Sequence, residues 1–314
     1  MPEVVEVFFT AIYLNNKLKN KQIREINILK GRYTKQHLNG LSSFKKNLPL
    51  KIKKIQSKGK FLWFELSGKN GNYYILNTLG MTGEWGFQKN ENSNISFNIE
   101  DPNSNKVKLY FTDYRNFGTV ILTKNVKKLE AKKNKLAPDF LTDSFDNEEF
   151  YQRIKNFITK KNEINQIKAN KNIVSVLMDQ TALGSGIGSY LAQEQLFKAK
   201  ISPHKKLIEF YNDKKLSDQL AYSIKYIIKL AYLTATIGYM EHLNPNMKNF
   251  IERFRAKIKN NPKNKYNFHP EIDINNDVFS FKIYRQKLDP IGNKVLTDKT
   301  LVKGRTIYYS PLQK

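Results

Sequence analysis

The chain has 314 residues, of which 54 are Lys or Arg and 28 are Asp or Glu, for a formal net charge of +26. This basic excess predicts a polyanionic partner, most simply nucleic acid, although an A·T-rich genome that favours Lys and Asn would explain part of it. Cysteine is absent and only four histidines occur, which excludes disulfides and thiolate nucleophiles. No stretch reads as a signal peptide or membrane span, so we expect a soluble intracellular protein.

The first residues are Met1-Pro2-Glu3, and residues 3–18 have the apolar spacing of an amphipathic helix. Removal of Met1 would leave Pro2 as a secondary amine that titrates at roughly 7.7–8.0. Such an amine attacks a sugar or carbonyl carbon to give an iminium, and Glu3 beside it is a candidate proton donor. On these residues alone, an ordinary helix start remains open, with Glu3 and Glu6 complementing the helix dipole.

Seven segments rich in β-branched and aromatic residues follow, separated by clusters of Gly, Asn, Asp and Ser. They are Ile23–Leu29, Leu50–Ile55, Phe61–Leu66, Tyr73–Leu79, Ile95–Ile99, Val107–Thr112 and Thr119–Thr123. We therefore expect residues 1–125 to form one helix on a mainly antiparallel β-sandwich. The Lys-rich stretch Lys124–Lys135 is predicted to connect this domain to a second one.

Three polar turns interrupt the predicted strands, at residues 57–60, 79–83 and 112–118. The first presents Lys60, the second carries Met81 between two glycines, and the third carries Arg115 and Phe117. Loops with apolar and cationic side chains are suited to wedging into a base stack. Each side chain taken alone could equally pack in the core or be solvated.

From about Asp146 to Lys259 the apolar period becomes helical, most strongly in Ser217–Met240. One helix is predicted to end near Gln180 and the next to begin near Ser189, with a Gly-rich turn between them. The N–H groups at such a helix start form an anion site, which favours a DNA phosphate. No Gly-Lys-Ser/Thr follows, so the turn is not a nucleotide-binding P-loop.

From Val278 the chain is predicted to return to strand. Asp289–Asn293 is a strong turn signal between strands at 279–286 and 294–296. A second turn at Lys303-Gly304 places Arg305 at a hairpin tip, where it can be solvated or can hold a phosphate bidentately.

In this order, the segments resemble the formamidopyrimidine-DNA glycosylase/endonuclease VIII family of base-excision repair enzymes over nearly the whole chain. The resemblance rests on Met1-Pro2-Glu3…Glu6, Lys60, Leu79–Gly83, Asp113–Gly118, Leu136–Asp139, Gly186–Glu194, Phe281–Arg285 and Gly304–Tyr308. It implies an α+β fold: a β-sandwich with an N-terminal helix, then a helical domain with a helix–two-turn–helix motif and a terminal finger of β-hairpins. We expect these parts at residues 1–125, 146–273 and 274–314, with a linker at 126–145.

The resemblance implies a bifunctional DNA glycosylase and AP lyase that flips a damaged base out of the duplex. Pro2 would attack C1′ and form a Schiff base, Glu3 would serve as general acid or base, and Lys60 and Arg305 would hold the flanking phosphates. The void-filling residues would be Met81, Arg115 and Phe117, and the residues that orient phosphate or nucleotide would be Gly188, Ser189, Glu194 and Glu6.

The chain departs from the family pattern at the finger. The positions that match the family's four zinc-binding cysteines hold Ile291, Lys294, Ser310 and Gln313. These residues are not a soft zinc ligand set, so we expect no metal and no cofactor, as in the zincless-finger Nei-like branch. The hairpin could survive without metal if Ile291 and the neighbouring aromatic rings pack together. In addition, Ser189 stands where the family has a phosphate-binding asparagine, and Asn116 replaces a frequent arginine.

The Nei-like resemblance favours oxidised pyrimidines and further-oxidised or ring-opened purines in double-stranded DNA over 8-oxoguanine, and the family implies a monomer.

One alternative is a DNA- or RNA-binding protein without catalysis on the same scaffold, which would have no reason to keep Pro2, Glu3 and Lys60 together. A metal-dependent nuclease would need clustered carboxylates or histidines, and here they are dispersed.

Overall fold

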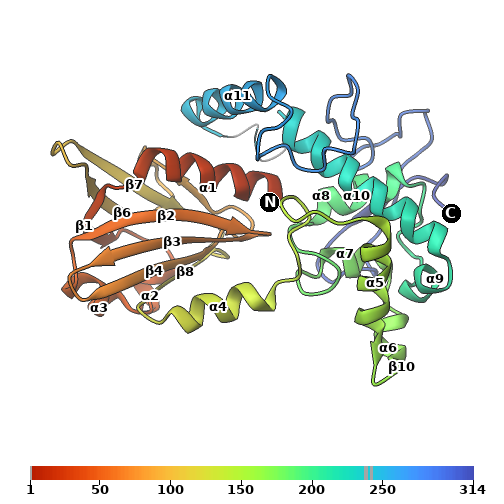
Figure 1. Ribbon diagram of the computed structural model, residues 1–314, viewed down its shortest axis with the longest axis horizontal. Coiled ribbons are helices and arrows are strands. Elements are labelled where there is room, and N and C mark those ends of the chain that lie inside the picture. The colour runs from red at the N-terminus through yellow and green to blue at the C-terminus, as the bar shows by residue number, and fades with distance from the viewer. Residues whose placement is uncertain (1, 237–239, 241–242) are drawn as a thin grey trace. The chain divides into compact units, whose positions relative to one another are not determined.

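A computed structural model describes residues 2–236, 240 and 243–314 (Figure 1). Residues 237–239 of the predicted helical segment lie outside this description. The chain divides into two compact units. The first comprises Met1–Pro2, Glu6–Lys135 and His242–Arg253, and the second comprises Glu3–Val5, Leu136–Glu241 and Phe254–Lys314. The chain passes from one to the other after Lys135, within the stretch expected as a linker, and the finger belongs to the same unit as the helices.

The first unit is built on an antiparallel eight-stranded sheet of order β5-β7-β6-β1-β2-β3-β4-β8. The strands are β1 (Gln22–Ile28), β2 (Leu50–Lys58), β3 (Phe61–Gly68), β4 (Gly71–Thr78), β5 (Glu84–Gly86), β6 (Ser93–Glu100), β7 (Lys106–Thr112) and β8 (Thr119–Thr123). β1 and β2 pair only at Gln22↔Lys51 and Ile23↔Leu50, so the sheet divides there into two four-stranded halves. This arrangement confirms the predicted β-sandwich. All seven predicted strands form, and the short β5 was missed.

Aromatic rings from several strands fill the core of this sheet. Trp85 lies 5.2 Å from Phe64, 5.8 Å from Phe97 and 5.1 Å from Phe111 between ring centroids. Its indole N–H donates to the Asn77 side-chain oxygen at 3.0 Å, which satisfies the one polar group that the ring buries.

Helix α1 (Val4–Leu18) follows directly after Pro2 and Glu3, as its apolar spacing predicts. Val5, Phe9 and Leu14 on this helix are fully buried. Three further helices of the first unit are α2 (Arg32–Lys35), α3 (Leu41–Lys46) and α4 (Val126–Lys135). The Lys-rich stretch expected as a connection is thus largely helical.

The described helices of the second unit are α5 (Asn147–Ile158), α6 (Gln166–Ala169), α7 (Ile173–Met178), α8 (Ser189–Lys198), α9 (Leu207–Asn212) and α10 (Lys214–Thr234); α11 (Pro245–Lys259) runs from the first unit into it. α5 begins where predicted because the Asp146 side chain caps its N–H groups. α10 stops at Thr234, earlier than predicted, since Ala235 is extended. Among the described residues, no helix has both the length and the apolar character to cross a bilayer.

Two small hairpins complete the second unit. They are formed by β9 (Thr159–Lys160) with β10 (Glu163–Ile164), and by β11 (Leu296–Asp298) with β12 (Ile307–Tyr309). The strand predicted at Phe279–Gln286 is wrong, because this segment forms bends and turns. Its backbone N–H groups donate to a buried carboxylate instead of to a neighbouring strand, as described below.

Candidate active site and nucleic-acid interface

Glu3 is anchored on the start of α8. Its side chain is 1% exposed, and its carboxylate accepts hydrogen bonds from the backbone N–H groups of Gly188 at 2.6 Å, Tyr190 at 3.0 Å and Leu191 at 3.3 Å. These N–H groups have no acceptor within their own helix, and the positive end of the helix dipole favours a carboxylate there. The residue next to Pro2 therefore caps a helix that begins 186 residues later, at Ser189.

The Gly-rich turn permits this contact because its backbone comes very close to the N-terminal segment. The Val4 N–H donates to the Gly186 carbonyl at 3.0 Å. Gly186 has a φ of +111°, and a Cβ there would lie 2.5 Å from the Val4 Cβ. Only glycine fits this conformation and this approach.

The expected DNA-phosphate site at the start of α8 needs correction. Gly188 donates its N–H to Glu3, so that donor is not available to a phosphate. Ser189 remains a candidate, since it is 6% exposed and its hydroxyl has no hydrogen-bond partner within the described protein. A buried hydroxyl without a partner is costly unless a ligand or water engages it.

Glu194 on α8 holds the segment predicted as a strand. Its carboxylate accepts hydrogen bonds of 2.9–3.1 Å from the backbone N–H groups of Lys282, Ile283 and Tyr284. Burial raises the pKa of Glu194, although these three N–H groups favour the ionised form. Glu194 therefore organises the turn that carries Tyr284.

Tyr284 is a residue of the site that the sequence alone did not single out. Burial raises the pKa of its hydroxyl. The charge of Arg285 opposes this upward shift, the charges of Glu3 and Tyr308 reinforce it, and the charge of Arg305 opposes it. Its ring lies 5.9 Å from the ring of Tyr308. Tyr284 thus lies within electrostatic range of both Glu3 and Arg305, two predicted catalytic residues from opposite ends of the chain. No local sequence signal marks a tyrosine whose neighbours are so distant in the chain.

Arg305 lies in the loop between β11 and β12, as predicted. The turn is closed by the Arg305 N–H, which donates to the Val302 carbonyl at 3.0 Å, and Gly304 has a φ of +70°. On the following strand, the Tyr308 N–H donates to the side chain of Gln193 on α8 at 2.7 Å. The hairpin that carries Arg305 is therefore fixed to the helix that Glu3 caps.

Lys60 and Glu6 belong to the first unit. Lys60 occupies the two-residue turn between β2 and β3, next to the pair Lys58↔Phe61, as predicted. Glu6 is buried in the first turn of α1, and the hydroxyl of Thr10 donates to its carbonyl at 2.8 Å.

The three predicted void-filling residues come together on two adjacent loops. The Arg115 guanidinium lies 3.7 Å from the sulfur of Met81, and Phe117 is 59% exposed. A Cβ on Gly80, whose φ is +64°, would lie 2.6 Å from the backbone nitrogen of Gly118, so the two loops are in close backbone contact. Phe117 therefore does not pack in the core, and it is displayed beside Met81 and Arg115.

The buried Asp113 side chain joins the two loops at residues 79–83 and 112–118. It is 1% exposed and accepts hydrogen bonds from the Gly118 N–H at 2.6 Å and from the Thr82 hydroxyl. Asn116, at the position of a frequent arginine, is turned inward: its oxygen accepts from the Arg32 backbone N–H and from Asn94.

The expected packing of Ile291 is wrong, because its side chain is 71% exposed. Hydrogen bonds centred on Asp289 join the two loops that hold the positions matched to zinc-binding cysteines. Asp289 accepts from the Ile291 N–H at 3.1 Å and from the Ser310 hydroxyl at 2.7 Å. Within the part of the chain that the structure describes, no cluster of His, Cys, Asp or Glu could hold a metal ion.

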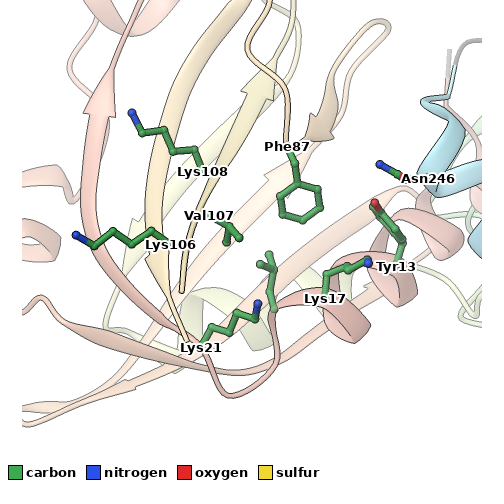
Figure 2. Close-up of a pocket in the computed structure, with 9 residues that line it drawn as sticks. Tyr13, Lys17, Lys21, Phe87, Lys106, Val107, Lys108 and Asn246 are labelled. Atoms are coloured by element: carbon green, nitrogen blue, oxygen red, sulfur yellow. The ribbon is translucent and has the colours of Figure 1, made fainter. Parts of the chain in front are cut away.

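A basic pocket of about 510 Å³ lies in the first unit (Figure 2). Its walls include Lys17, Lys21, Lys106 and Lys108 together with Tyr13 and Phe87. Lys17 complements the C-terminal dipole of α1, and Lys106 and Lys108 lie on the part of β7 that β5 leaves unpaired, where charge discourages strand addition. Lys17 is about 20 Å along α1 from Glu3, so we do not assign this pocket to the site.

Comparison with known proteins places the chain in a family. Residues 1–120 match the family model of the formamidopyrimidine-DNA glycosylase N-terminal domain, and residues 270–314 match that of the C-terminal domain. The formamidopyrimidine-DNA glycosylase of Ureaplasma parvum is 32% identical over 65% of this chain and 69% of its own length, and that of Ligilactobacillus salivarius is 30% identical over 65% and 68%. Matches to such relatives span about two thirds of their length.

Solved structures agree on the fold. A Lactococcus lactis Fpg in complex with Fapy-dG-containing DNA has a TM-score of 0.70 at 22% identity and covers 100% of this chain and 99% of its own. A MutM in complex with carbocyclic 8-oxo-G-containing DNA has a TM-score of 0.71 at 21% identity, with the same coverage. The fold is that of a base-excision repair glycosylase scaffold. The chain belongs to the formamidopyrimidine-DNA glycosylase family.

Proposed function

We propose that the chain is a bifunctional DNA glycosylase and AP lyase that acts as a monomer on damaged double-stranded DNA. The docking of Glu3 on the start of α8 carries the proposal, because it fixes the residue next to the Pro2 nitrogen at the helix–two-turn–helix motif. The net charge of +26 supplies the attraction to the phosphate backbone.

In the first half of the reaction, Met1 is absent and the Pro2 nitrogen attacks C1′ of a flipped nucleotide. The bond between C1′ and the base nitrogen breaks, and the base leaves with the bonding electrons and takes up a proton. The Glu3 carboxylate takes the proton from the Pro2 nitrogen, the C1′–O4′ bond opens, Glu3 passes that proton to O4′, and an iminium joins Pro2 to C1′. Three backbone N–H groups hold the Glu3 carboxylate in one orientation for this transfer.

In the second half, the iminium acidifies the C2′ proton. Loss of this proton sends electrons toward the iminium and expels the 3′-phosphate, and a second elimination expels the 5′-phosphate. Lys60 and Arg305 hold these phosphates, for which lysine supplies a point charge and arginine a planar pair of donors. Met81, Arg115 and Phe117 occupy the space left by the flipped nucleotide.

For substrates, we propose oxidised pyrimidines and ring-opened or further-oxidised purines. Support comes from the relatives, since Lactococcus lactis Fpg has been solved with Fapy-dG-containing DNA and with DNA that contains an oxidised pyrimidine. A zincless finger of the Nei-like kind is consistent with this range. We propose that neither zinc nor another cofactor takes part.

A cleavage assay on a lesion panel tests the proposal. Duplexes of one sequence would carry an oxidised pyrimidine, a ring-opened purine, 8-oxoguanine, an abasic site or no lesion. We expect cleavage of the first two and of the abasic duplex, with phosphate at both new ends, and an intact undamaged duplex. If none of the lesion duplexes is cleaved while DNA binding persists, the non-catalytic alternative holds.

A further inference from the structure

The finger has two loops that the family pattern would join through a metal. Loop 289–294 contains the matched positions Ile291 and Lys294, and loop 310–313 contains Ser310 and Gln313. Asp289 is 5% exposed and Ser310 is fully buried. A buried carboxylate needs several donors to remain ionised, and these two loops provide them.

One oxygen of the Asp289 carboxylate binds only its own loop, and the other binds both loops. Oδ1 accepts the backbone N–H groups of Ile291 at 3.1 Å and Asn293 at 2.9 Å. Oδ2 accepts the Asn293 amide at 3.0 Å and the Ser310 hydroxyl at 2.7 Å. One residue therefore cross-links the two loops.

The second loop is tied in turn to the helical part of the same unit. The Ser310 N–H donates to the Gln313 side chain at 2.8 Å, and that side chain donates to the Ile201 carbonyl at 2.8 Å. The Lys314 N–H donates to the Lys200 carbonyl at 3.1 Å. Ser310 directly follows β12, and at the middle of β12 the Tyr308 N–H donates to the Gln193 side chain. β12 is thus held at its middle and just after its last residue, and it begins two residues after Arg305.

We propose that Asp289 is a positioning residue that takes over the cross-linking task of a metal: it fixes β12 and hence presents Arg305 to a DNA phosphate. The contact between Arg305 and DNA rests on the proposed function. The cross-link that Asp289 makes between the two finger loops does not. Asp289 acts through Arg305 and does not touch the DNA.

The test uses Asp289→Asn in the full chain, which preserves the size of the side chain and removes its charge. We expect affinity for a duplex that carries a tetrahydrofuran abasic analogue to fall roughly 10- to 100-fold, as for loss of one charged contact. The slope of log Kd against log salt should fall by about one, which is the signature of one lost phosphate contact. A general loss of stability would not change this slope. Asp218→Asn, which removes a carboxylate partner of Lys214 on α10, is the matched control.

A double-mutant cycle separates positioning from an independent effect. Asp289→Asn should add little to Arg305→Ala, because both remove the same contact, and it should be additive with Lys60→Ala. Additivity with Arg305→Ala, or an unchanged salt slope in Asp289→Asn, would overturn the proposal.

Amide hydrogen exchange of the free protein distinguishes this proposal from the proposed function. In Asp289→Asn we expect faster exchange at Ile307–Tyr309 and unchanged exchange in α1 and α5. Unchanged exchange in β12 would overturn the positioning role. If exchange rises as expected but Arg305→Ala binds the duplex like the parent, then the proposed DNA contact fails and the finger cross-link stands.

Discussion

Glu3 accepts a 2.6 Å hydrogen bond from the backbone N–H of Gly188, so the third residue of the chain caps a helix that begins 186 residues later, at Ser189. This contact ties Glu3 to the helix–two-turn–helix motif within the second unit. The predicted catalytic acid or base therefore also has a structural task, and the two can be separated by experiment.

Glu3→Gln should lower both stability and activity. The amide cannot accept from all three N–H groups as the carboxylate does, so we expect a loss of roughly 1.5–3 kcal/mol in the free energy of unfolding. Urea unfolding followed by circular dichroism measures this, with the exposed Glu91→Gln as control. Normal stability with lost activity would show that the carboxylate acts only in the chemistry and does not anchor α8.

Phe117→Ala should impair lesion excision without affecting stability. Because the ring is 59% exposed, its removal should change the free energy of unfolding by no more than about 0.5 kcal/mol. Loss of a base-stacking ring should cost roughly 1–3 kcal/mol in kcat/KM for excision. Tyr114→Ala, equally exposed in the same turn, is the matched control, and an equal loss in both variants would contradict a specific wedge role for Phe117.

Metal removal should leave the enzyme active. The finger is joined by the hydrogen bonds of Asp289 and Ser310, and the matched positions offer no soft ligand set. Excision after dialysis against a chelator should equal that of the untreated protein. Loss of activity that returns with added zinc would overturn this expectation.

Acid should destabilise the second unit through His269. Its ring bonds to the Phe140 carbonyl at 2.8 Å. Burial lowers the pKa of His269; the Phe140 carbonyl and Glu271 oppose this, and Lys225 and Lys229 add to it. Since the folded state disfavours the charged ring, the stabilisation is present above the unfolded pKa, near 6.5, and is lost as pH falls below it.

The urea midpoint of the parent should therefore fall more steeply between pH 7.5 and 5.5 than that of His269→Gln, whose amide can keep the Phe140 contact. Parallel pH profiles for the two proteins would show that His269 does not carry the effect.

The parts of the site that the sequence predicted well are those with local signals. The starts of α5 and α8 follow capping and glycine patterns, and the Arg305 hairpin follows its turn residues. The strand expected at Phe279–Gln286 failed because its β-rich composition does not reveal that Glu194, almost ninety residues earlier, takes its N–H groups. The residue pattern of 279–286 allows a strand, but the buried Glu194 carboxylate binds its backbone N–H groups in a turn.

The partners of individual side chains were harder to predict than the positions of helices, strands and turns. An apolar Ile291 suggested packing, yet the finger is joined through the polar Asp289 and Ser310. The Gly-rich turn suggested a phosphate site, yet the anion at α8 is Glu3. Both errors concern which partner satisfies a polar group, and that depends on contacts between segments far apart in the sequence.

The central claim is that the Pro2 nitrogen is the nucleophile. Borohydride reduces an iminium, so it should trap a covalent adduct between the protein and a lesion duplex when the N-terminus is free. The measurement compares protein tagged at the C-terminus with protein whose N-terminus is blocked by a tag, at equal DNA occupancy. We predict an adduct with the first and none with the second. Equal trapping with the blocked N-terminus would contradict the assignment and would point to a lysine amine in place of Pro2.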